Sequence, residues 1–222
     1  EIFGFGAGGM FTYGFQLMIT GYYLLYYMTD IAGFSTVLAA SLYSTIQIIK
    51  MVTMLFSGVI IDAINFRSGK YRTWVLVSGI GLGLFFPLSF FYYPLPQSVY
   101  VVVFMIIYTL QTLFYNVGWT AMRAVIGKVA KNKADVVALN TSAQSAGTIS
   151  SILYGYIGYP ILGIALWAGT KQAYGCASAI YGLTIILAAI YMFCAFGKYE
   201  HQADEAAPVK KQRTGFFEMF NA

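Results

Sequence analysis

A lysine in the middle of a long apolar segment is the residue best suited to chemistry in this sequence. Lys50 lies within the apolar stretch of residues 36–64. A charge at the centre of a membrane helix costs about 2.5–3.5 kcal/mol on insertion scales, and such residues usually face a bundle interior. We hypothesise that Lys50 is functional, either as a fixed charge replacing a mobile cation or as a group that binds an anion on a substrate. The alternative is a structural lysine that pairs with an acid from another segment or with backbone carbonyls.

Polar side chains recur at helical spacing in four of the apolar segments, so each set shares one helix face. Gln, Asn, Tyr and Trp side chains can hydrogen-bond the edge of a sugar and pack an aromatic ring against its apolar face. The same residue types also join helices to one another, which is the alternative for every residue in the set. For the set as a whole we predict a substrate cavity. Its candidate lining residues are Gln16, Gln47, Lys50, Tyr115, Asn116, Trp119, Asn140 and Gln144.

A second cluster of chemically suggestive residues follows the segment that contains Lys50. A glycine precedes an aspartate by four positions, and a basic turn that contains another glycine comes next. Glycine allows close helix approach, and an aspartate at a helix end can hold basic groups of a neighbour. The pattern predicts a gating latch at the cytoplasmic face. Its residues are Gly58, Asp62, Arg67, Gly69, Lys70 and Arg72.

The elements that must position these residues are long apolar segments. Only 9% of the 222 residues are charged and 59% are hydrophobic, whereas soluble domains carry roughly 25% charged residues. This composition excludes a soluble globular domain, a disordered chain and a nucleic-acid-binding module. A membrane-spanning helix needs about 20 apolar residues, and six segments fit: 3–29, 36–64, 74–93, 98–122, 136–167 and 173–196. We predict an all-α membrane protein with a six-helix transmembrane bundle over 1–196 and a cytoplasmic tail or central-loop segment over 197–222.

Basic residues are distributed unequally between the connections. Eleven of the 13 Lys and Arg residues lie between the second and third segments, between the fourth and fifth, or in the tail. Because basic loops stay on the cytoplasmic side, these connections and both chain ends are predicted to be cytoplasmic.

Enzyme motifs are missing from the sequence. The one histidine, His201, lies in the tail, and the two cysteines, Cys176 and Cys194, have no metal-ligand spacing. We predict no catalytic residues, no cofactor, no metal site and no nucleic-acid partner. Membrane lipid is the expected surrounding.

Five short motifs, in their order along the chain, resemble one known family. They are residues 3–8 (FGFGAG), 26–30 (YYMTD), 58–72, 69–74 (GKYRTW) and 115–120 (YNVGWT). The pattern is similar to the glycoside-pentoside-hexuronide cation symporters of the major facilitator superfamily, the relatives of melibiose permease. The resemblance implies that this chain is the amino-terminal half of a twelve-helix carrier in a bacterial inner membrane. Such a carrier would move a sugar, glycoside or uronide by alternating access, with a second six-helix half as partner.

The chain departs from that family where the family binds its coupling cation. An ungapped alignment back from Gly58 places Lys50 and Met54 at the usual acidic positions of the second helix. A helix-four acid of some members is Asn116 here, and the helix-five arginine falls near Asn140. The expectation is therefore a carrier that is not coupled to sodium. Two alternatives remain: a six-helix scaffold or accessory subunit that transports nothing, and a half-transporter that works as a homodimer.

Overall fold

The structure is a computed structural model that describes residues 23–64, 66, 69–130, 132–169 and 171–205. All regular secondary structure in these residues is helical. In chain order the elements are α3 (Leu24–Tyr26), η3 (Tyr27–Ile31), α4 (Thr36–Ala63), α5 (Lys70–Phe90), α6 (Gln97–Val129), α7 (Lys133–Ala165), η4 (Leu166–Ala168) and α8 (Ala173–Glu205). Most of the predicted first segment falls outside the described residues.

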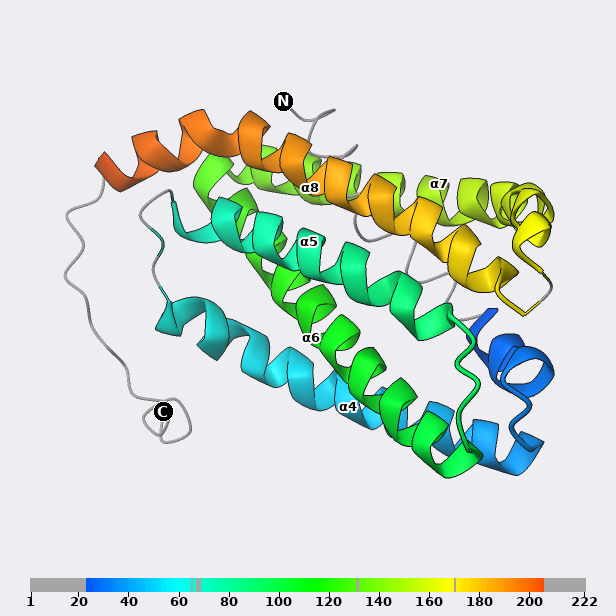
Figure 1. Ribbon diagram of the computed structural model, residues 1–222. Helices are drawn as coiled ribbons and strands as arrows, with labels where there is room; N and C mark the ends of the chain where they lie inside the picture. The colour runs from blue at the N-terminus through cyan, green and yellow to red at the C-terminus, as the bar shows by residue number, and fades with distance from the viewer. Residues whose placement is uncertain (1–22, 65, 67–68, 131, 170, 206–222) are drawn as a thin grey trace.

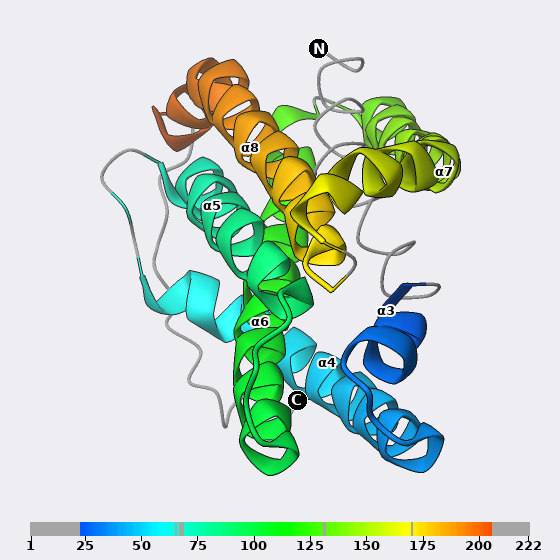
Figure 2. The ribbon, with the colours of Figure 1, turned by 45° about the vertical axis from the view of Figure 1, so that its right-hand side comes forward.

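The long helices form a bundle with two distinct ends (Figure 1). At the left of Figure 1, α4 and α6 end and α5 and α7 begin; we call this the basic end, because it carries Lys70, Lys128 and Lys133. The other end carries the short connections 91–96 and 169–172, and we call it the hairpin end. Helices α5 and α8 lie side by side in opposite directions (Figure 1), and α7 lies next to α8 (Figure 2).

Four of these helices are long and apolar enough to cross a membrane. They are α4, α5, α6 and the part of α8 from Ala173 to Phe196. Helix α7 has 33 residues, but polar side chains interrupt its apolar sequence and it is not among these candidates. Helix α8 continues to Glu205, past residue 196, where the predicted six-helix bundle ends. The helical membrane class is therefore supported, whereas the count of six spans stays a prediction.

Glycine contacts set the spacing of α5 and α8. A Cβ atom at Gly83 would lie 2.6 Å from the carbonyl oxygen of Gly182 and 2.5 Å from Ile186 Cγ1. A Cβ atom at Gly182 would overlap the carbonyl oxygen of Gly83, and one at Gly79 would overlap Ala189. Small residues allow such backbone approach in membranes, where packing replaces much of the hydrophobic driving force.

At the hairpin end, hydrogen bonds join residues that are far apart in the sequence. The Tyr27 hydroxyl donates to the Phe91 carbonyl oxygen at 2.8 Å and lies 2.7 Å from the Tyr100 hydroxyl. Across the bundle, the Gln172 amide donates to the Tyr92 carbonyl oxygen at 3.0 Å and accepts from the Tyr92 backbone N–H at 3.3 Å. The connection after α5 is thus held by α6, by η3 and by the residue before α8.

Two glycine-to-alanine variants should distinguish a steric clash at the α5–α8 contact from the effect of helix propensity on stability. We expect Gly83→Ala to destabilise the protein by about 1–3 kcal/mol, since the methyl group meets backbone that cannot withdraw. Gly127→Ala on α6 is the matched control, because a Cβ atom there meets nothing within 4 Å and alanine favours helix by roughly 0.5–1 kcal/mol. Thermal unfolding in detergent should show a lower Tm for the first variant and an unchanged or higher Tm for the second. Equal shifts would contradict the close α5–α8 contact.

Candidate functional site

Lys50 lies midway along α4 with a half-buried side chain. Its own carbonyl oxygen accepts hydrogen bonds from Asn116 Nδ2 at 3.0 Å and from Thr53 Oγ1 at 3.2 Å. Within the described part of the chain no carboxylate forms an ion pair with its ammonium group; the pair found there joins Lys70 to Asp62. Lys50 is thus a cation within an apolar helix whose charge is not balanced by an ion pair in these helices.

Asn116 joins α6 to α4 at the level of Lys50. Its side chain is 5% exposed, and its amide also donates to Thr53 Oγ1 at 2.7 Å. One turn further along both helices, the Ser57 and Thr120 hydroxyls lie 2.7 Å apart. Because both contacts advance in the same direction, α4 and α6 run parallel and in register here. The amide of this predicted lining residue is engaged between the two helices.

A cationic and aromatic stripe follows α6 at positions 115, 119 and 123. The rings of Tyr115 and Trp119 are stacked, with an interplanar angle of 14° and centroids 6.4 Å apart. The Arg123 guanidinium lies 4.5 Å from the centre of the Trp119 ring, and its Nη1 donates to Asn140 Oδ1 of α7 at 2.9 Å. The structure therefore brings two predicted residues, Trp119 and Asn140, together through an arginine that the sequence analysis counted only as a loop cation. The i, i+4, i+8 spacing was the signal that could have revealed it.

The remaining predicted lining residues lie on the same helices or outside the described part. Gln47 is exposed on α4, one turn before Lys50, and Gln144 is exposed on α7, one turn after Asn140. Gln16 lies outside the described residues. Candidate side chains therefore occur along α4, α6 and α7.

The predicted latch is present at the basic end as an ion pair. Lys70 Nζ lies 2.5 Å from Asp62 Oδ1, with the lysine side chain 26% and the aspartate 73% exposed. Gly69, directly before α5, has φ 107°, a value that favours glycine. Arg72 lies 4.9 Å from the ring centre of Phe193 on α8, and Arg67 lies outside the described residues.

The described helices do not make the close approach that was expected at Gly58. Among the described residues a Cβ atom there meets nothing within 4 Å. The neighbouring Ser57, which is 1% exposed, faces α6 and makes the contact with Thr120, so a helix approach at Gly58 stays a prediction.

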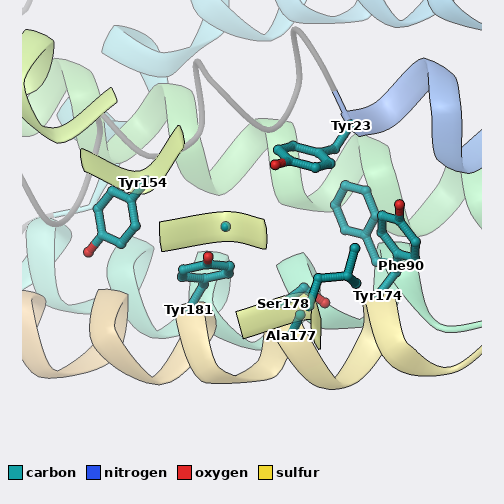
Figure 3. A pocket seen from close by; sticks show the side chains of 9 residues that line it. Tyr23, Phe90, Tyr154, Tyr174, Ala177, Ser178 and Tyr181 are labelled. Carbon is teal, nitrogen blue, oxygen red and sulfur yellow. The ribbon is translucent and has the colours of Figure 1, made fainter. Parts of the chain in front are cut away.

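A separate aromatic pocket lies toward the hairpin end (Figure 3). It encloses about 390 Å³ of empty space, including its open mouth, between α5, α7, α8 and Tyr23. Tyrosine and phenylalanine rings dominate its walls, with Tyr23 opposite Tyr181 and with Phe90 beside Tyr174 (Figure 3). None of the predicted lining residues that the structure describes belongs to it, because Asn140 and Gln144 lie nearer the start of α7 and the others lie on α4 and α6.

The long apolar helices identify an integral membrane protein. Comparison with known proteins narrows this class. A family model described as MFS/sugar transport protein matches residues 4–222, and the chain therefore belongs to the MFS/sugar transport protein family.

Three curated relatives show the same relationship at low identity. YagG of Escherichia coli (strain K12), described as a proposed glycoside/cation symporter, is 25% identical over 94% of this chain and 45% of its own length. The isoprimeverose transporter of Lactiplantibacillus pentosus is 23% identical over 90% of this chain and 40% of its own length. The inner membrane symporter YicJ of Escherichia coli (strain K12) is 22% identical over 78% of this chain and 37% of its own length. The chain spans less than half the length of these relatives.

These findings confirm the family resemblance drawn from the motifs. They also confirm that the chain belongs with membrane transport proteins and not with enzymes.

The hydrogen bonds of Asn116 should contribute to stability. Asn116→Ala leaves the Lys50 carbonyl oxygen and Thr53 with one partner fewer at the α4–α6 contact, and we expect a loss of about 0.6–1.7 kcal/mol. Gln144→Ala on the exposed face of α7 is the control and should leave the Tm unchanged. Thermal unfolding in detergent measures both; an unchanged Tm for Asn116→Ala would show that its amide does not join the helices.

Proposed function

We propose that this chain forms one half of a secondary transporter that moves a sugar, glycoside or uronide across a bacterial inner membrane by alternating access, without sodium coupling. The observation that carries the proposal is Lys50, a half-buried cation within a membrane helix whose charge no described carboxylate pairs. The substrate class follows the names of two relatives, YagG and the isoprimeverose transporter.

The cavity in this proposal is a shared one. The candidate side chains of α4, α6 and α7 are exposed or half-buried, except for Asn116. A second six-helix half, from the same chain continued or from another copy, would cover them and complete the cavity. Substrate sites between two such halves lie near the middle of the bilayer.

The proposed topology has six membrane helices over 1–196, a tail over 197–222, and both chain ends in the cytoplasm. The basic end is then the cytoplasmic end, which agrees with the positive-inside rule. Asp62 and Lys70 would close the cytoplasmic side of the pathway in one state of the transport cycle.

Electrostatics argue against sodium binding beside Lys50. Two unit charges 4 Å apart repel by about 4 kcal/mol at an effective dielectric constant of 20. That energy corresponds to nearly a thousandfold loss of affinity. The ammonium group instead supplies the positive charge that a bound cation would bring.

Uptake into proteoliposomes tests this proposal. We expect the full-length protein to show saturable sugar uptake that an imposed Na⁺ gradient does not accelerate. Lys50→Ala should lower substrate affinity at least tenfold or make uptake ion-dependent, while Lys171→Gln, in the connection at the hairpin end, should behave like wild type. Sodium-driven wild-type uptake, or unchanged uptake in Lys50→Ala, would remove Lys50 from the mechanism. No saturable uptake by folded protein would instead support a scaffold.

The ion pair at the basic end should affect transport more than stability. An exposed pair contributes about 0–1 kcal/mol, so Asp62→Asn should leave Tm nearly unchanged. If the pair closes the cytoplasmic side, the initial uptake rate should fall severalfold, and the charge-reversed double variant Asp62→Lys/Lys70→Asp should recover part of it. Asp30→Asn, an exposed aspartate near the hairpin end, is the control. Wild-type uptake in Asp62→Asn would show that the pair has no gating role.

A further inference from the structure

Neutral groups hold Arg123 in place. The Trp119 ring packs against its guanidinium at 4.5 Å, and Asn140 Oδ1 accepts from Nη1 at 2.9 Å. Within the described residues no carboxylate forms an ion pair with Arg123. A guanidinium has five N–H donors, so these two contacts fix its position and leave donors for another group.

The guanidinium points from the basic end back toward the middle of the bundle. Trp119, which it covers, lies one turn closer to the start of α6 than Arg123 does. Asn116 marks the level of Lys50 on this helix, and seven residues separate it from Arg123, which is about 10 Å along the axis. Folding back over Trp119 shortens that distance.

Away from the helix ends, the charged side chains described on α4 and α6 are positive. Lys50 and Arg123 are both cations, whereas the acids that the structure describes on α4 to α7 lie at helix ends, where Asp62 pairs with Lys70 and Asp135 occupies the first turn of α7. Charges of one sign attract ligands of the opposite sign. The planar guanidinium matches a carboxylate with two parallel hydrogen bonds.

We propose that Arg123, positioned by Trp119 and Asn140, binds the carboxylate of an acidic sugar and makes this protein selective for uronides over neutral glycosides. The stacked Tyr115 and Trp119 rings lie directly beside the guanidinium and offer a flat surface for the apolar face of the sugar ring. This inference rests on the proposed transport function and selects one substrate class within it.

Two pairs of sugars that differ only at C6 test the inference. The probes are the methyl β-glucuronide and methyl β-galacturonide, each compared with the corresponding methyl glucoside or galactoside. Full-length protein in proteoliposomes should take up a uronide with a lower KM than its neutral counterpart. Arg123→Gln should raise the uronide KM at least tenfold and change the KM of the neutral sugar less than twofold.

Further variants separate binding from a structural role. Arg123→Lys keeps the charge but loses the bidentate geometry, so we expect a smaller loss for the uronide. Asn140→Ala should also give an intermediate loss, because Nη1 then lacks the acceptor that orients it. Lys133→Gln removes a cation from the exposed start of α7 and is the control that should leave both sugars unaffected. The Tm of each variant shows that it is folded.

The remaining outcomes overturn the inference in distinguishable ways. Equal losses for uronide and neutral sugar in Arg123→Gln would assign the arginine to α6–α7 packing. A wild-type preference for the neutral sugar would also overturn the inference, and both results leave the proposed sugar transport intact. No uptake of any of the four sugars by folded wild-type protein would overturn the inference and the proposed function together.

Discussion

Polar groups inside a membrane bundle need partners within the protein, and this constraint places the candidate site. The Asn116 amide meets it by donating to the Lys50 carbonyl oxygen and to Thr53. That contact, extended by Ser57 and Thr120, keeps two parallel helices in register. As a result the ammonium of α4 lies at a defined level relative to the aromatic and cationic stripe of α6. The Asn116 side chain therefore sets the relative level at which the proposed lining residues of α4 and α6 lie.

The two ends of the bundle are held by different chemistry. At the hairpin end, neutral hydrogen bonds connect Tyr27 with Phe91 and Gln172 with Tyr92. At the basic end, the connection between α4 and α5 carries an exposed ion pair, which water and salt weaken. Hydrogen bonds among partly buried groups are less accessible to water than an exposed pair. Salt should therefore weaken the ion pair at the basic end more than the hydrogen bonds at the hairpin end.

The helical membrane class could be predicted from sequence because apolar length is a local property, whereas the six spans and the cytoplasmic chain ends stay predictions. The site could be predicted only in part. Trp119 and Asn140 were recognised from residue type and spacing, but the predicted fourth segment ended at residue 122 and α6 continues to Val129, so Arg123 was counted as a loop cation. The Asn116 amide donates to the backbone carbonyl oxygen of Lys50. A pattern of side-chain types along the sequence cannot predict a contact with the backbone. Ser57, and not Gly58, makes the α4–α6 contact, because a one-residue difference on a helix is a rotation of 100°.

The reciprocal glycine contact of α5 and α8 has a consequence for the evolution of this bundle. The carbonyl oxygen of Gly83 occupies the space of a side chain at Gly182, and the carbonyl oxygen of Gly182 does the same at Gly83. A larger residue at either position cannot be offset by a smaller one at the other, since both are already the smallest. Sequence change at these two positions is therefore blocked unless the helices move apart there. Change is easier on α4, α6 and α7, whose exposed faces can vary without moving the α5–α8 pair.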